Sequence, residues 1–201
     1  MNKTQDNGPV LFCGDPHGRL RHIIEAAEAT TASAVVLLGD METARPMHLE
    51  LAPIADRVWW IPGNHDSDSD DLWRNVFGSE LADRNVHGRV VRLPDGTRLA
   101  GLGGVFTHSV WYPSASAARG GVPAFRSRSE HAEATPVKER WMGAGPPRRH
   151  WGSIYAAELD ALADMRADIL VTHEAPGYHA NGFDILDTFA QALGVKASIH
   201  V

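Results

Sequence analysis

Short apolar runs recur along the first part of the chain, and each one ends in glycine or in Pro-Gly. These runs cover residues 9–13, 34–38 and 57–61. Runs of this length, bounded by turn-forming residues, predict buried β-strands. Between the first two, Leu20, Ile23, Ile24 and Ala27 recur at the spacing of an amphipathic helix, and a weaker helix is expected over residues 47–55. This order predicts parallel strands joined by helical crossovers.

The pattern changes in the second part of the chain. Residues 90–93 and 98–102 flank an Asp-Gly turn, which predicts a β-hairpin. Residues 105–152 are rich in Ser, Pro, Gly, Arg and His and show no sustained periodicity, so we expect a long loop that forms a lid or insertion. Further elements are expected at residues 155–162 (helix), 168–172 (strand), 184–193 (helix) and 197–201 (strand). The whole chain, residues 1–201, is expected to be one α/β domain.

Residue types that commonly bind metals follow the predicted strands. The sequence reads Gly-Asp-Pro-His-Gly at 14–18, Gly-Asp at 39–40 and Gly-Asn-His-Asp at 63–66, and Thr-His closes a later strand at 172–173. Open α/β sheets place their sites at the carboxyl ends of parallel strands. Each segment taken alone could equally be an ordinary turn, because Gly, Pro, Asn and Asp are common turn residues. Their joint placement favours a metal site, and the residues expected to form it are Asp15, His17, Asp40, Asn64 and His173.

This mixture of nitrogen and oxygen ligands suits Mn, Fe or Zn. Two such ions, roughly 3.5 to 4 Å apart, can hold a phosphoryl group and activate a water for in-line attack. Asp40 has two oxygens that could bridge both ions, and His65 would lie beside them, free to protonate the leaving oxygen. Asp66 would either orient His65 or cap the helix that follows.

Taken together, these segments resemble the calcineurin-like metallophosphoesterases over residues 10–176. The resemblance implies a four-layer α/β/β/α sandwich with a two-metal phosphoesterase centre. It implies that Asp15 and His17 bind the first metal, that Asp40 bridges the two, and that Asn64 and His173 bind the second. It also implies that His65 is the catalytic histidine.

The chain departs from the family pattern at two places. Thr43 stands where the family often has an acid, which leaves the partner of His65 open. The family's closing Gly-His-x-His is absent from these 201 residues, and the last predicted strand ends at Val201. We therefore expect that the last strand or strands are truncated, that a partner or water completes the site, or that activity is weak or absent. His200 is a poor substitute ligand, because it lies on the predicted strand itself.

These departures leave two classes of function open. The first is an enzyme that hydrolyses a phosphomonoester or phosphodiester. The second is a metal- or phosphate-binding module without strong catalysis. A third possibility, a simple nucleotide-binding domain, is weak, because Asp15 and His17 occupy positions where a phosphate-binding loop needs small residues.

Composition indicates where the protein is located and which kinds of partner are not expected. A formal net charge of -6 argues against a broad nucleic-acid-binding surface. No apolar run approaches the roughly 18 to 20 residues of a membrane span, and the polar segment 1–8 lacks the apolar core of a signal peptide. Cys13 is the single cysteine, which fits a reducing compartment, so the expected location is the cytoplasm.

The expected substrate is a phosphorylated small molecule or a nucleotide. Within residues 105–152, Arg148 and Arg149 are expected to bind its phosphate through bidentate hydrogen bonds, although a solvated loop is the simpler alternative. Trp111, Tyr112 and Trp141 would stack on a base or pack the loop onto the domain. Oligomeric state is left open.

Overall fold

A computed structural model describes residues 8–114 and 119–201, so most of the polar N-terminal segment lies outside the described residues. Its strands are β1 (Val10–Cys13), β2 (Ala34–Leu37), β3 (Val58–Trp60), β4 (Arg89–Arg92), β5 (Arg98–Leu102), β6 (Ile169–Thr172) and β7 (Ala197–Ile199). Its α-helices are α1 (Arg21–Ala29), α2 (Met47–Glu50), α3 (Asp70–Val76), α4 (Arg128–Ala134), α5 (Ala156–Leu162) and α6 (Asp184–Leu193). None of the helices in these residues has the length and apolar character needed to cross a membrane.

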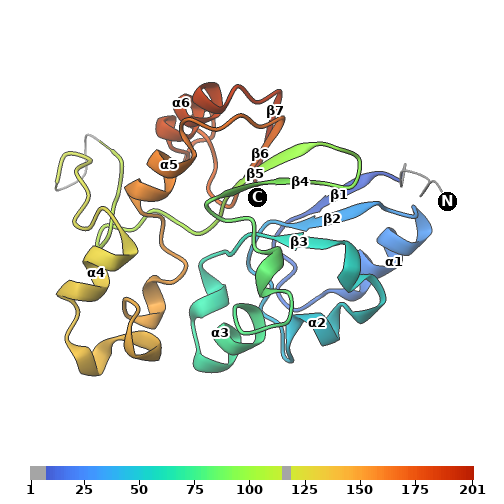
Figure 1. The fold of residues 1–201 in the computed structure, drawn as a ribbon, viewed down its shortest axis with the longest axis horizontal. Coiled ribbons are helices and arrows are strands. Elements are labelled where there is room, and N and C mark those ends of the chain that lie inside the picture. Colours follow the sequence, from blue (N-terminus) through green and yellow to red (C-terminus); the bar gives the residue numbers. More distant parts are fainter. Residues whose placement is uncertain (1–7, 115–118) are drawn as a thin grey trace.

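The strands form two sheets. One sheet has the order β1-β2-β3 and is parallel throughout. The other has the order β4-β5-β6-β7, in which β4 and β5 form the predicted antiparallel hairpin and the remaining pairs are parallel. In Figure 1 the helices α1, α2 and α3 cover the outer face of the first sheet, and α5 and α6 cover the outer face of the second.

The alternation of side chains along β2 explains how these layers are held together. Val35 and Leu37 point outward and belong to the apolar cluster shared with α1. Ala34 and Val36 point the other way, into the cluster between the two sheets, where they meet Val171 of β6. Both faces of a fully buried strand therefore contact apolar partners, as expected for a covered parallel sheet. The predicted four-layer α/β/β/α sandwich is confirmed.

Two predicted elements differ from the structure. The helix expected over residues 47–55 breaks after Glu50, and a 3₁₀ helix (Ala52–Arg57) continues the chain. Pro53 lies in the first turn of that helix, and its missing N–H and ring prevent an α-helix from running through it. The loop expected over residues 105–152 contains α4 and three short 3₁₀ helices (Val137–Glu139, Trp141–Gly143 and Arg148–His150).

We call residues 105–114 and 119–152 the lobe, most of which lies to the left in Figure 1. Its two ends meet, because the Val105 N–H donates to the Gly152 carbonyl at 2.8 Å and the Ile154 N–H donates to the Val105 carbonyl at 3.0 Å. Side chains from the lobe also pack on α3, where Trp73 contacts Trp141 and Trp151 edge to face at 5.6 and 5.2 Å between ring centroids. These aromatic rings therefore pack the lobe onto the domain.

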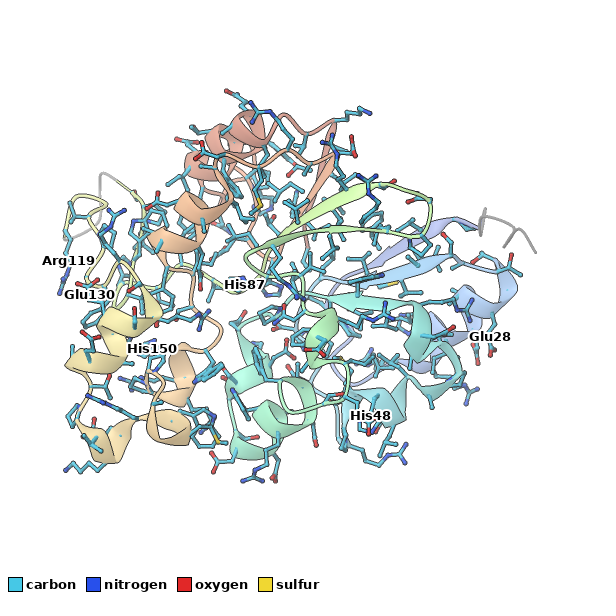
Figure 2. All side chains as sticks on the ribbon, in the orientation of Figure 1. Glu28, His48, His87, Arg119, Glu130 and His150 are labelled. Atoms are coloured by element: carbon cyan, nitrogen blue, oxygen red, sulfur yellow. The ribbon has the colours of Figure 1, made fainter. Side chains whose placement is uncertain are left out.

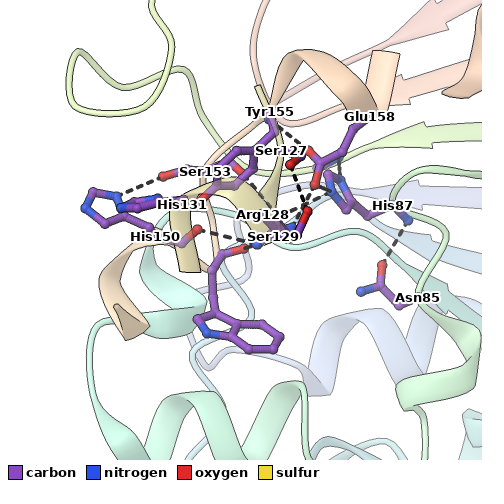
Figure 3. Close-up of polar contacts among 12 residues, drawn as sticks. Asn85, His87, Ser127, Arg128, Ser129, His131, His150, Ser153, Tyr155 and Glu158 are labelled. Atoms are coloured by element: carbon purple, nitrogen blue, oxygen red, sulfur yellow. Dashed lines mark hydrogen bonds and ion pairs between the residues drawn. The ribbon is translucent and has the colours of Figure 1, made fainter. Parts of the chain in front are cut away.

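A largely buried polar network ties the lobe to α5 and to the segment before β4 (Figure 3). The Arg128 guanidinium donates to Glu158 Oε1 at 2.7 Å and to the carbonyls of Trp151 and Ser153, each at 3.0 Å. His87, near the centre of Figure 2, adds its Nε2 at 3.1 Å from the same Glu158 oxygen. Because α4, α5 and the segment that leads into the strand hairpin all contribute, the position of the lobe depends on side chains far apart in the sequence.

Candidate metal centre

The predicted motif segments, residues 14–18, 39–42 and 63–66, meet at the carboxyl edge of the first sheet. Backbone hydrogen bonds connect the first two: the His17 N–H donates to the Asp40 carbonyl at 3.0 Å and the Gly18 N–H donates to the Met41 carbonyl at 2.9 Å. The third segment is joined to the second through a side chain, because the His65 N–H donates to Asp40 Oδ1 at 2.9 Å. Asp40 is therefore fixed by both neighbours.

Four residues of these segments adopt a left-handed backbone that side chains disfavour. Asp15, His17, Asp40 and Glu42 have φ values of 43°, 42°, 52° and 44°. Each such residue costs of order 1–2 kcal/mol, and strain of this kind gathers at functional sites. In an extended strand Asp15 and His17 would point to opposite faces. The left-handed turn instead brings their side chains to the same side.

Two glycines permit the close approach of the segments. A Cβ on Gly39 would lie 2.5 Å from His173 Nδ1, and a Cβ on Gly63 would collide with the carboxylate and backbone nitrogen of Asp40. Any larger residue at Gly63 would displace the residue that both neighbouring segments hold. The backbone of Gly63 does not have a positive φ, so its conformation alone does not require glycine. Glycine is required because a side chain would have no room.

Asp15, His17 and Asp40 form a group that could hold a metal ion. One ligand atom from each lies within 4.8 Å of the others. The side chains of Asp15 and His17 are 41% and 44% exposed, whereas that of Asp40 is 5% exposed. The group therefore has an open side, facing solvent, and a buried side.

Asn64 and His173 lie on the buried side. The His173 side chain is 8% exposed, with Nε2 3.2 Å from Asn64 Oδ1 and 3.7 Å from Asp40 Oδ2. Its Nδ1 lies 2.8 Å from the Leu38 carbonyl, which can only accept a hydrogen bond, so the proton of the neutral ring is on Nδ1. The lone pair of Nε2 then faces two oxygen acceptors. This convergence of electron pairs, with the other ring nitrogen bonded to a carbonyl, fits a bound divalent metal ion.

Asp66 holds the segments together through their backbone. Its fully buried carboxylate accepts hydrogen bonds from the N–H groups of Asp40, Met41, Glu42 and Gly63, at 2.8 to 3.2 Å. Burial, with a contribution from the Asp40 charge, raises the pKa of Asp66 to about 6 against the opposing effect of these N–H groups. Both sequence-based roles for Asp66 are wrong, because its oxygens are directed to the backbone and the cap of α3 is Ser69.

Two histidines at the open side each have a carboxylate partner that sequence reasoning did not assign. His17 Nδ1 lies 2.7 Å from Glu42 Oε1, and His65 Nδ1 lies 2.6 Å from Asp68 Oδ2. These hydrogen bonds are the main reason why the pKa of each histidine is raised. A sequence signal for Asp68 was available: it stands three residues after His65, which is one turn of a 3₁₀ helix.

The two predicted substrate-binding arginines have different surroundings. The Arg148 guanidinium forms an ion pair with Asp70 at 2.8 Å and donates a short hydrogen bond to the Ser67 carbonyl, just after the third motif segment. Arg149 is exposed, and its Nε donates to His150 Nε2 at 3.1 Å. Arg148 is therefore near the centre but already paired, whereas Arg149 is available to solvent.

The hydrogen-bond partners of the His200 ring lie outside the group of possible ligands. Its Nε2 lies 2.8 Å from the Tyr178 hydroxyl and its Nδ1 lies 2.8 Å from the Val201 carbonyl. In the described part of the chain, the group of possible metal ligands consists of Asp15, His17 and Asp40, and it does not include His200.

The fold and these donor groups define an α/β sandwich protein with a candidate metal centre. The chain belongs to the calcineurin-like phosphoesterase family, whose family model matches residues 8–200, so the predicted resemblance is confirmed. A protein of Haemophilus influenzae described as uncharacterized is 38% identical over 192 residues, covering 95% of this chain and 81% of that protein. The crystal structure of TT1561 of Thermus thermophilus shares the fold, with a TM-score of 0.59 and 18% identity over 95% of this chain and 80% of that one.

Proposed function

We propose that this protein is a metal-dependent phosphoesterase that uses two divalent ions, Mn, Fe or Zn, to hydrolyse a phosphomonoester or phosphodiester. The observation that carries the proposal is the position of Asp40. Its carboxylate belongs to the group with Asp15 and His17, and its Oδ2 also lies 3.7 Å from His173 Nε2. A buried carboxylate between two sets of ligands suits a residue that bridges two ions.

In this proposal Asp15, His17 and Asp40 hold one ion, and Asp40, Asn64 and His173 hold the other. When bound, such ions neutralise phosphoryl oxygens and lower the pKa of a water for in-line attack. The protein residues fix the arrangement beforehand, since the backbone holds Asp40 and the Leu38 carbonyl orients His173. Little reorganisation is then needed when the substrate binds.

His65 is the proposed general acid. Its ring is 45% exposed at the open side of the centre, and its centroid lies 6.0 Å from that of His17. With Nδ1 bonded to Asp68, its Nε2 is the ring atom left to reach a substrate oxygen. Protonation of the leaving oxygen by a placed histidine typically contributes about 10²- to 10⁴-fold.

The charges around the centre support metal dependence. Asp15, Asp40 and Glu42 are gathered at the place where a phosphate would bind. A phosphate anion is repelled by these carboxylates unless cations lie between them. We propose a phosphorylated small molecule or nucleotide as the substrate, with Arg149 as the free candidate for contacting its phosphate.

The test is hydrolysis of p-nitrophenyl phosphate and its bis ester by chelator-treated protein, before and after addition of Mn²⁺. We expect that Mn²⁺ restores turnover of at least one ester. Asp40→Asn should lower kcat/KM at least about 10³-fold, because several kcal/mol of charge stabilisation are lost. His65→Ala should lower it about 10²-fold or more for an ester whose leaving group needs protonation, such as phenyl phosphate.

Two results would contradict the proposal. If Mn²⁺ binds and neither ester turns over, the protein is a metal- or phosphate-binding module without this catalysis. If Asp40→Asn retains full activity, catalysis does not occur at this centre.

A further inference from the structure

The two histidines at the open side of the centre form a matched pair with different environments. Each has a carboxylate oxygen on Nδ1, Glu42 at 2.7 Å from His17 and Asp68 at 2.6 Å from His65. His17 belongs to the group of possible metal ligands, whereas His65 does not. The same type of contact can therefore serve two purposes: orienting a ligand in one case and orienting a proton donor in the other.

A single turn of chain creates the contact between Asp68 and His65. His65 begins the 3₁₀ helix His65–Ser67, and Asp68 is its C-cap, with its N–H donating to the His65 carbonyl at 3.1 Å. Residues three apart in such a turn lie on the same side, so the carboxylate reaches the ring. A carboxylate accepts from Nδ1, which leaves Nε2 as the ring atom facing outward.

The other acidic groups near His65 are committed elsewhere. Asp66 accepts from four backbone N–H groups, and Glu42 is bonded to His17. Thr43, at the position where the family often has an acid, is buried and cannot replace a carboxylate. Within the described residues, Asp68 is the carboxylate recorded in hydrogen-bond contact with the His65 ring.

We propose that Asp68 is the positioning residue of His65 in this chain, supplied from a different place in the sequence than the family pattern suggests. This inference rests on the proposed function. Protonated His65 transfers the proton on Nε2 to the ester oxygen as the P–O bond to the leaving group breaks, while the attacking water forms its new P–O bond and releases a proton to solvent. The neutral ring keeps its proton on Nδ1, where it donates to the ionised Asp68 carboxylate, and Nε2 regains a proton from solvent.

The decisive measurement uses leaving groups of different quality. The p-nitrophenolate group can leave without being protonated. The phenolate group of the corresponding phenyl ester is more basic, so its departure depends more on a proton donor. We expect Asp68→Asn to lower kcat for the phenyl ester about 10- to 100-fold, the usual effect of losing such an orienting partner, and to change the p-nitrophenyl reaction far less. His65→Ala should show the same selectivity, and the double variant should be no slower than His65→Ala, since the two act as a unit.

Asp71→Asn is the matched control. Asp71 is a nearby exposed carboxylate that pairs with Arg74 on α3 at 2.7 Å, and its loss should leave both reactions unchanged. Equal losses for the two esters in Asp68→Asn, or a double variant slower than His65→Ala by the full Asp68→Asn factor, would overturn the proposal.

Two readouts do not depend on turnover. In the metal-free protein, ¹⁵N NMR of the imidazole groups should show His65 with its proton on Nδ1, and Asp68→Ala should shift the ring toward the Nε2-protonated form. By calorimetry, Mn²⁺ affinity should be unchanged in Asp68→Asn and about 10- to 100-fold weaker in Glu42→Gln. An unaltered His65 tautomer, or a loss of Mn²⁺ affinity in Asp68→Asn, would overturn the positioning role. If the wild-type protein hydrolyses no ester while the NMR result holds, the failure lies with the proposed function.

Discussion

The motif segments and the lobe are held in place by different kinds of interaction. In the motif segments the backbone supplies most of the contacts: left-handed residues turn the chain, Gly63 allows close approach, and Asp66 gathers four N–H groups. In the lobe the fixed points are side chains, chiefly Arg128 and Glu158. The motif segments are therefore sensitive to a loss of space around the backbone, and the lobe is sensitive to a loss of charge.

The largest effect is expected from Gly63→Ala. The new methyl group would collide with Asp40, which has no room to move between its two neighbours. We expect a loss of about 3 kcal/mol in the free energy of unfolding, measured by urea denaturation, with weakened Mn²⁺ binding. Gly88→Ala is the control, because Gly88 has a φ of 70° but nothing within 4 Å of the added Cβ. It should cost about 1 kcal/mol. Equal costs for the two variants would contradict the role given to close approach.

Arg128→Met should show the contrasting sensitivity of the lobe. It leaves Glu158 without its closest partner and removes the donor to the carbonyls of Trp151 and Ser153. Breaking a buried pair costs about 3–5 kcal/mol, and the partial exposure of this pair reduces the expectation to about 2 kcal/mol. The folded variant should still bind Mn²⁺, because backbone contacts hold the motif segments.

The control for this prediction is Arg126→Met. Arg126 also pairs with α5, through Asp160, but both side chains are more than 60% exposed. Its loss should cost less than about 1 kcal/mol. An Arg126→Met variant as unstable as Arg128→Met would show that burial of the network is not what stabilises the lobe.

The same contrast explains which features the sequence predicts. The bounds of α6 and the hairpin follow from local patterns, and the motif segments are visible because each is a short run after an apolar strand. The helix α4 was missed although Ser127 and Glu130 have the spacing of an N-terminal cap, and Ser127 Oγ does accept from the Glu130 N–H at 3.1 Å. The contact between Arg128 and Glu158 spans 30 residues, and no local pattern indicates it.

Mild acid should also weaken the contacts of the lobe. Burial, followed by the charges of His131 and Arg149, lowers the pKa of His150 to about 4. Burial opposes ionisation of Glu158, but His87 and Arg128 overcome it and lower the pKa of that carboxyl to about 2. The buried, uncharged His150 ring contributes to the stability of the lobe above the ordinary histidine pKa, and this contribution is lost as pH falls from about 6.5 to 4. The ionised Glu158 contributes to stability as well, and its contribution is lost as pH falls below about 4.5.

Acidification should therefore loosen the lobe by roughly 1–3 kcal/mol between pH 7 and pH 4. Amide hydrogen exchange, corrected for the intrinsic exchange rate at each pH, measures the loss of stability in each part of the chain separately. Residues 119–152 should lose protection, while β2 keeps its own. Uniform loss across both regions, or greater protection of the lobe at pH 4, would contradict the distinction between them.

We propose that Asp40 lies between two metal ions, and anomalous diffraction from crystals grown with Mn²⁺ would locate these ions. We expect two anomalous peaks, each within about 2.5 Å of a carboxylate oxygen of Asp40. One peak should also be bound by Asp15 and His17, and the other by Asn64 and His173. Crystals whose only manganese lies away from Asp40, or whose centre holds none at saturating Mn²⁺, would show that Asp40 does not bridge two ions.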